Sequence, residues 1–327
     1  MLAFFRNNLS TTVFLLALYT VALHLPAMLG WVQMPARSEE LTSLLFRDLF
    51  GWAAKEQSRS AVTATVLVFF QALLVHYLAD HFRMLNDRSW YPGVFYALAA
   101  SCLPEFQFVS PTLVAASFIP LALWRIFSVY KQTFAFSAIF DGALWVTLAA
   151  LFYPPAVWVL PAAYLALLNL RAFSFREQVV FLTGSFTPFF LGLSWYFWFD
   201  QAGTYLLIQF THFFSWPTFT SPDELLNGLK ITFLGLLLLS TMFSFNIYYY
   251  KRLIQVQKYV TILYWFLFAG LAATLFQHTF RPEFILLAVP SIGIFLSYLF
   301  ESIRNQALSE ILHLGLLAAT YSLQFYP

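Results

Sequence analysis

Long apolar segments alternate with short polar ones along most of the chain. Within an apolar segment such as "FLGLLLLSTMF" the residues lack the two-residue alternation of strands in a membrane β-barrel. An α-helix needs about 20 apolar residues to cross the hydrocarbon core of a bilayer. We count about eleven segments near this length, at 10–30, 60–79, 91–104, 108–129, 135–153, 155–171, 178–199, 226–246, 259–277, 283–300 and 307–324. The pattern predicts an all-α fold, a polytopic transmembrane helix bundle that forms a single integral-membrane domain over residues 1–327.

Some of these segments are irregular. The third, 91–104, is short and bounded by proline, which predicts a tilted or incomplete span. "TYLLIQFTHFF", at 204–214, is too short to cross, and we expect an interfacial segment within the loop 200–225. "YPGVFYALAASCLPEF" and "FYPPAVWVLP" place prolines at span ends. Broken helices at membrane depth are usually buried in protein or line a cavity.

Composition supports the membrane class and excludes others. Hydrophobic residues make up 61% of the chain and charged residues 10%, against about 45–50% and 25% in soluble domains. The lipid bilayer is therefore the first expected partner. A net charge of +2 is too small to suggest a nucleic-acid partner, and the single Cys102 excludes a disulfide framework. The apolar N-terminal segment has no small-residue cleavage site and is expected to be a retained first span.

The distribution of Lys and Arg predicts the orientation. Loops on the cytoplasmic side of a membrane protein carry the excess of these residues. If the N-terminus is cytoplasmic, eleven of the 17 Lys and Arg residues fall on the cytoplasmic side: Arg6, Arg83, Arg88, Arg125, Lys131, Arg171, Arg176, Lys251, Arg252, Lys258 and Arg304. We therefore predict a cytoplasmic N-terminus, and the loop 31–59 then faces outward.

This outer loop holds the densest run of charge in the chain, "RSEELTSLLFRDLFGWAAKEQSR". Residues 38–53 are predicted to form an interfacial amphipathic helix with Ser38 as its N-cap. Its apolar face comprises Leu41, Leu44, Leu45, Leu49 and Trp52. Asp48 interrupts that face, and an unpaired carboxylate there is costly. Asp48 therefore either pairs with an arginine from another loop or points into a membrane-level cavity.

Other polar residues suggest either packing or chemistry. Glu39 and Glu40 lie in the first helical turn, where acids also suit the helix dipole without any further role. Arg125 and Asp141 are expected to form a structural ion pair between neighbouring helices. His278 and Arg281, in "QHTFRPEF", are expected to bind phosphate or to anchor the loop in the interface.

Two glycine-containing segments have a simpler interpretation. "GSFTPFFLG" and "GLLLLS" are expected to contain glycines that pack against neighbouring helices. The sequence contains none of the HExxH, GxSxG, P-loop or GxGxxG motifs. The candidate chemistry therefore rests on the charged residues of the loops.

The run 110–160 resembles a family of multi-spanning inner-membrane proteins from Bacteroidota. "LALWRIFS", "FDGALW" and "AALFY" carry this resemblance. It implies a multi-pass protein of the bacterial inner membrane, and that family implies no particular activity.

A more distant resemblance is to GT-C-type glycosyltransferases, which take sugars from polyprenyl-phosphate carriers. "SEELTSLLFRDLFGW" is similar to their acidic first outer loop, and "FRPEFILLAVPSIGIFLSYLF" to a late arginine-containing loop before a span with an internal proline. The passage "HYLADHFRMLNDRSWYPGVFYALAASCLPEF" is similar to their second and third spans. The chain departs from the family in having Glu39 and Glu40 where an Asp-led motif is usual. A GT-C-like fold that has lost catalysis is compatible with this difference.

Two functions agree with these observations. In the first, Arg281 and His278 bind the phosphate of a polyprenyl-phosphate sugar at the outer face. One acid among Glu39, Glu40 and Asp48 then acts as general base on the acceptor hydroxyl or positions a divalent cation. In the second, the protein is a non-catalytic membrane scaffold or accessory subunit in envelope assembly, and its partners are other membrane proteins. A transporter is less well supported, because internal repeats are not evident and Asp141 is the only acid well inside a span.

Overall fold

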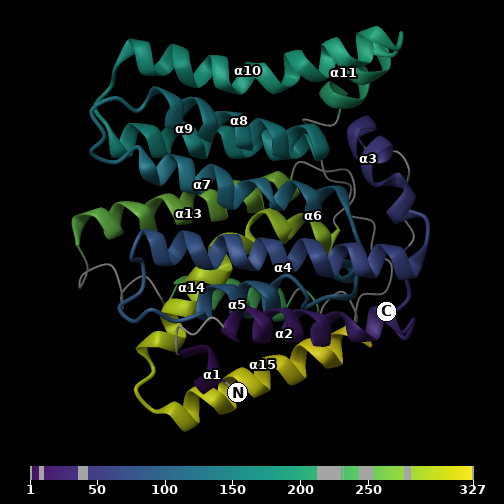
Figure 1. Ribbon diagram of the computed structural model, residues 1–327, viewed down its shortest axis with the longest axis vertical. Helices are drawn as coiled ribbons and strands as arrows, with labels where there is room; N and C mark the ends of the chain where they lie inside the picture. The colour runs from purple at the N-terminus through teal and green to yellow at the C-terminus, as the bar shows by residue number, and fades with distance from the viewer. Residues whose placement is uncertain are drawn as a thin grey trace.

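The helices of the computed structural model lie roughly parallel to one another and are stacked along the long axis of the molecule (Figure 1). The structure describes residues 2–6, 11–35, 43–211, 230, 232–242, 253–275 and 281–325. No strand occurs among these residues. The α-helices are α1 (Leu2–Arg6), α2 (Thr11–Met28), α3 (Leu44–Ala54), α4 (Gln57–His81), α5 (Tyr91–Ala99), α6 (Pro111–Ala116), α7 (Phe118–Ser128), α8 (Phe136–Phe152), α9 (Val159–Leu170), α10 (Phe175–Trp198), α11 (Ala202–Thr211), α13 (Ile254–Leu275), α14 (Val289–Ser302) and α15 (Gln306–Gln324). The 3-10 helices are η2 (Pro104–Gln107), η3 (Pro154–Trp158) and η4 (Pro282–Leu287).

The helices pack in a regular succession. α10 and α11 form one edge of the molecule and α15 the other (Figure 1). Between them α10 packs on α8, α8 on α7, α7 on α4 and α4 on α2. α15 is held along α2 by hydrogen bonds, among them one of 2.7 Å from the Tyr321 hydroxyl to the carbonyl of Ala22. α5 lies in the interior with all of its residues buried, between α4 and α14.

Within the described part of the chain, five helices are long and apolar enough to cross a membrane: Thr11–Met28, Gln57–His81, Pro111–Ser128, Phe175–Trp198 and Ile254–Thr274. Four shorter apolar helices accompany them: Phe136–Phe152, Pro154–Leu170, Thr232–Met242 and Val289–Ser302. The prediction of a helical, multi-pass membrane protein is thus confirmed, whereas the count of eleven spans stays a prediction. The irregular third span is a nine-residue helix, α5, followed by a turn and η2.

The bundle has two ends that matter for function. α3 leads directly into α4, whose 25 residues rise about 37 Å before the loop 82–90. We call the end that holds α3 the α3 end and the end that holds α1 and this loop the α1 end. Figure 1 shows α15 ending beside the end of α2, at the α3 end of the bundle. In the predicted orientation the α3 end faces outward.

The helix in the outer loop starts later than predicted. Ser43 has extended backbone, and its hydroxyl accepts a hydrogen bond from the Phe46 amide at 3.2 Å, so Ser43 caps a helix that begins at Leu44. A continuous helix over 38–53 is therefore wrong, and Ser38 and Leu41 lie outside the described residues. Phe46 packs inward, while Leu49 and Trp52 of the predicted apolar face are exposed on the protein surface. The interfacial position of this helix stays a prediction.

Candidate functional site at the α3 end

Three 3-10 helices, η2, η3 and η4, interrupt or precede transmembrane segments, and each begins with proline. Proline suits the first position of a helix, because its fixed φ is already helical and its missing N–H would be unpaired there. Two of the three repeat the same tripeptide, Pro-Glu-Phe, at 104–106 and 282–284. The repeat places Glu105 and Glu283 at the same position in their first turns.

The three 3-10 helices gather at the α3 end. η2 packs against η4, η4 against α6 and α13, and η3 against α8 and α13. The rings of Tyr153, which precedes η3, and Phe284 in η4 stack with centroids 5.4 Å apart. Most residues of the three helices are buried. The proline-rich segments therefore lie inside protein, as broken helices at membrane depth should.

A buried ion pair lies in this region. Lys230 donates to Glu105 Oε1 at 2.7 Å, and the two side chains are 6% and 18% exposed. The second carboxylate oxygen of Glu105, Oε2, is buried and has no hydrogen-bond partner among the described residues. A buried charged oxygen without a partner is costly, and such groups often have a functional role.

A second pair lies on η4. Arg281, just before the helix, is half-buried, and its Nη1 is 4.0 Å from Glu283 Oε1. Glu283 is buried. Because η2 packs against η4, the α3 end brings together two carboxylates and two cations from three separate parts of the sequence. The cations of these pairs can bind a phosphate, and their carboxylates can accept a proton.

Asp48 projects from α3 toward α10. The phenol of Tyr196 donates to Asp48 Oδ2 at 2.9 Å, and Arg47 Nε lies 3.6 Å from Oδ1. The ring of Tyr205 in α11 stacks on Tyr196, and burial raises the pKa of Tyr205 to about 12. The arginine beside Asp48 thus comes from its own helix rather than from another loop, and the contact with a distant element is made by Tyr196.

The predicted site residues are only partly described. Glu39, Glu40 and His278 lie outside the described residues. Asp48 and Arg281 belong to elements at the same end of the bundle: Phe50 of α3 contacts the ring of Phe152, and the next residue, Tyr153, stacks on η4. The segment that carries Asp48 and the segment that carries Arg281 therefore lie at the same end of the bundle.

Arg125 and Asp141 form an ion pair between the consecutive helices α7 and α8, with Arg125 Nη2 2.6 Å from Asp141 Oδ2. Both side chains are about one third exposed. We expect a coupling energy of about 1 kcal/mol or less, since partial exposure weakens such pairs. A double-mutant cycle of Arg125→Gln and Asp141→Asn in thermal unfolding measures it. A coupling energy near zero would mean that the two side chains contribute to the fold independently.

The Glu105–Lys230 pair was not predicted from the sequence. Both residues stood out only as outer-face charges, and 125 positions separate them. The repeated Pro-Glu-Phe tripeptide is the signal that would have drawn attention to Glu105 together with Glu283. Within the described residues no group of three or more His, Cys, Asp or Glu side chains could hold a metal ion.

The comparisons with known proteins identify the fold. No protein-family model and no curated protein matches the chain, so the resemblance to a Bacteroidota family stays a prediction. Among solved structures, the chain is similar to ArnT from Cupriavidus metallidurans bound to undecaprenyl phosphate, with a TM-score of 0.52 and 12% identity. The match covers 92% of this chain and 58% of that chain. It is also similar to the archaeal oligosaccharyltransferase AglB from Archaeoglobus fulgidus in complex with an inhibitory peptide and a dolichol-phosphate, with a TM-score of 0.49 and 12% identity over 96% of this chain and 51% of that one.

The described residues form an all-helical fold with the apolar helices of a multi-pass membrane protein, and this fold resembles that of ArnT. The chain spans little more than half the length of the two similar structures. At this level of identity the likeness concerns the fold alone. What the protein does has to be argued from its own residues.

Proposed function

We propose that the protein binds a polyprenyl-phosphate-linked sugar at the α3 end and transfers the sugar to an acceptor hydroxyl. The observation that supports this is the meeting of two carboxylate–cation pairs at helix breaks, at one end of a fold similar to that of ArnT. In our proposal the α3 end faces outward from the bacterial inner membrane, so that the carrier enters from the outer leaflet.

The cations have the role of holding the carrier. Arg281 offers a planar fork of donors that matches phosphate oxygens, and Lys230 adds a compact positive charge. His278, three positions before Arg281, is the further phosphate ligand that we expect from the sequence. Charges in a site with little water act more strongly on a phosphate than they would at a solvated surface.

A carboxylate has the role of general base. It removes the proton of the acceptor hydroxyl as the hydroxyl oxygen bonds to the anomeric carbon of the sugar. The bond from that carbon to the phosphate oxygen breaks, and polyprenyl phosphate leaves with the electron pair, next to the cations. Glu105 is our first candidate because its Oε2 has no partner within the described part of the chain. Asp48, Glu39 and Glu40 are the candidates from the sequence, either as base or as ligands of a divalent cation.

A non-catalytic scaffold is the second candidate function. The observation that favours it is the local engagement of Asp48, which Tyr196 and Arg47 hold at 2.9 and 3.6 Å. A carboxylate that serves to fix α3 against α10 needs no substrate. In this alternative the exposed aromatic side chains of α10 contact lipid and partner proteins.

A measurement of carrier binding distinguishes the two candidate functions and does not require the sugar to be known. Purified protein in nanodiscs is incubated with undecaprenyl phosphate or with undecaprenol, which lacks the phosphate, and bound lipid is counted by native mass spectrometry. We expect at least a tenfold preference for the phosphate, because charge-assisted hydrogen bonds contribute about 1.5–3 kcal/mol. Arg281→Gln should lose most of this preference. Arg59→Gln, an exposed arginine paired with Glu56 next to α3, should keep it.

Equal binding of the phosphate and the alcohol by the wild type would contradict carrier recognition and favour the scaffold. A preference that survives in Arg281→Gln would show that other residues bind the phosphate. Circular dichroism and thermal unfolding of the variants exclude loss of fold as the cause.

A further inference from the structure

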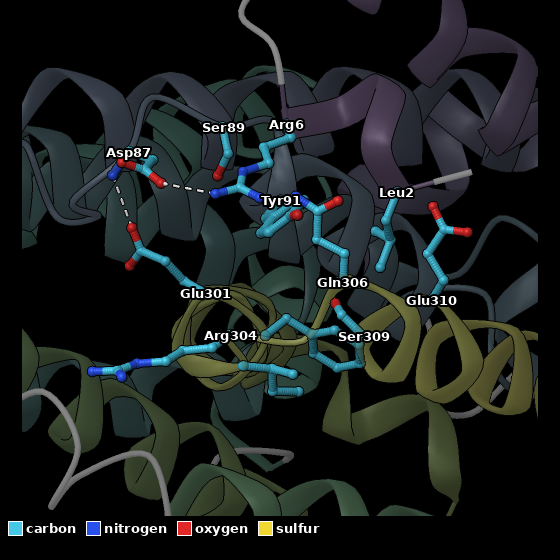
Figure 2. Close-up of a pocket in the computed structure, with 12 residues that line it drawn as sticks. Leu2, Arg6, Asp87, Ser89, Tyr91, Glu301, Arg304, Gln306, Ser309 and Glu310 are labelled. Carbon is cyan, nitrogen blue, oxygen red and sulfur yellow. Dashed lines mark hydrogen bonds and ion pairs between the residues drawn. The ribbon is translucent and has the colours of Figure 1, made fainter.

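A cavity lies at the α1 end, away from the candidate site. Its volume is about 480 Å³, and a second cavity of about 340 Å³ adjoins it and shares Asp87 and Ser89. Figure 2 shows Asp87 and Glu301 on one side, Glu310 on the other, and Tyr91 and Gln306 between them. The larger volume is within the range of about 300–1,000 Å³ that is typical of small-molecule sites.

Two serine hydroxyls that line this cavity have no hydrogen-bond partner among the described residues. Ser89 and Ser309 are 4% and 6% exposed, and neither side-chain oxygen is paired. Tyr91, which is 9% exposed, also lines the cavity and offers its phenol there. Buried hydroxyls are nearly always paired, so two unpaired ones in one cavity indicate a bound polar molecule.

The charges around the cavity are of both signs and are loosely paired. Arg6 Nη2 lies 3.8 Å from Asp87 Oδ2, longer than the 2.7–2.9 Å of a charge-assisted hydrogen bond. Glu301 instead accepts the backbone amides of Asn86 and Asp87, at 2.6 and 2.8 Å, and so fixes the loop that carries Asp87 and Ser89. Arg304 adds a second exposed cation at the rim. A ligand with one positive and one negative group can therefore insert between the side chains of Arg6 and Asp87.

Exposed apolar side chains stand on α1 and α15, the two helices that contribute Leu2, Arg6, Ser309 and Glu310 to the cavity. Phe4 of α1 is 68% exposed, and Leu308 and Ile311 of α15 are also exposed. These elements stand at the end of a transmembrane bundle, where the lipid headgroups meet the hydrocarbon. The combination of a polar cavity with exposed apolar side chains on these helices matches a lipid, whose headgroup enters the cavity and whose acyl chains lie along α15.

We propose that this cavity binds the headgroup of an aminophospholipid, with the phosphate at Arg6 and the primary ammonium at Asp87, Ser89 and Tyr91. A primary ammonium has three donors, and the oxygens of these three residues can accept them. A choline headgroup cannot donate these hydrogen bonds, and a glycerol headgroup lacks the cation. Both a lipid headgroup and a soluble molecule can carry a phosphate joined by a short linker to an ammonium group. The exposed apolar side chains on the neighbouring helices assign the ligand to a lipid.

Lipid retention tests the assignment. Protein is reconstituted into nanodiscs of phosphatidylethanolamine, phosphatidylglycerol and phosphatidylcholine in equal parts, released, and analysed by native mass spectrometry. We expect the wild type to retain phosphatidylethanolamine about tenfold over the other two, since a charged hydrogen bond contributes about 1.5–3 kcal/mol. Asp87→Asn should lose most of this preference, and Tyr91→Phe about fivefold of it. Arg176→Gln, an exposed arginine at the same end of the bundle but outside the cavity, should retain it.

Three outcomes overturn the proposal: equal retention of the three lipids, a preference for phosphatidylglycerol, or a preference that Tyr91→Phe leaves intact. A second arm adds soluble phosphoethanolamine to protein in nanodiscs of phosphatidylcholine alone. A rise in Tm of the wild type but not of Tyr91→Phe, without retention of phosphatidylethanolamine in the first arm, would assign the cavity to a soluble molecule instead. The result is independent of sugar transfer, because the cavity lies at the opposite end from Glu105 and Arg281.

Discussion

Replacement of Glu105 by Gln is expected to lower sugar transfer by about 10²–10⁴-fold, the usual contribution of a general base. The carboxylate is 18% exposed, one of its oxygens binds Lys230 and the other has no partner in the part of the chain that the structure describes. Gln keeps the size of the side chain but cannot accept a proton from the acceptor. The measurement is the transfer of labelled sugar from a polyprenyl-phosphate donor in proteoliposomes, and the expectation rests on the proposed function.

The same change also removes the partner of a buried cation. Lys230 is 6% exposed, and an uncompensated buried charge costs about 3–5 kcal/mol. A loss of activity in Glu105→Gln could therefore result from unfolding. The double variant Glu105→Gln with Lys230→Gln removes both charges and should recover most of the stability.

The double variant decides between the two roles of Glu105. If Glu105 is the base, transfer by the double variant stays far below that of the single variant Lys230→Gln, which lacks the same phosphate contact, although the fold is restored. Recovery of transfer in the double variant would show that Glu105 is structural, and would return attention to Asp48, Glu39 and Glu40. Glu56→Gln is the matched control, because Glu56 is an exposed acid next to α3 whose partner is Arg59 at 2.8 Å. Its transfer rate should match the wild type.

The fold could be predicted largely because hydrophobic burial in a bilayer follows segment length and composition. Most apolar segments became helices with ends a few residues from those expected, such as 60–79 against Gln57–His81. The Arg125–Asp141 pair could also be predicted, since two consecutive helices joined by a short loop must be neighbours. At 91–104 the short apolar length and the flanking prolines indicated an incomplete span, but they did not show that the helix would end at Ala99.

The candidate site was harder to predict, because its members meet through tertiary packing. Lys230 and Glu105 are 125 positions apart, and only the folding of η2, η4 and the intervening helices brings them together. For Asp48 the sequence showed correctly that a carboxylate on an apolar face needs a partner. It gave no means of choosing Tyr196, since the phenol of a tyrosine within a long apolar helix has no distinguishing pattern. The start of α3 was misplaced because Ser38 and Ser43 are equally acceptable caps by residue type.

Gly184 marks the closest approach of α10 to α8, and Gly184→Ala is expected to be strongly destabilising. A Cβ at this position would lie 2.5 Å from the carbonyl oxygen of Phe140, a backbone atom that cannot rotate away. The prediction of a helix-packing glycine in "GSFTPFFLG" is confirmed by this contact. Overpacking of this kind costs about 1–3 kcal/mol, more than the gain of up to about 1 kcal/mol from the higher helix propensity of alanine.

The matched control is Gly315→Ala on α15, where a Cβ would meet nothing within 4 Å. We expect this variant to keep or slightly raise the Tm, whereas Gly184→Ala lowers it, as measured by tryptophan fluorescence during thermal unfolding in detergent. Because α10 also carries Tyr196, a shift of α10 away from α8 should lengthen the hydrogen bond to Asp48. Gly184→Ala should therefore also loosen α3, which limited proteolysis of the loop before Ser43 would detect. An unchanged Tm in Gly184→Ala would mean that α10 can move off α8 without loss of stability, and the contact between α3 and α10 would then not depend on this packing.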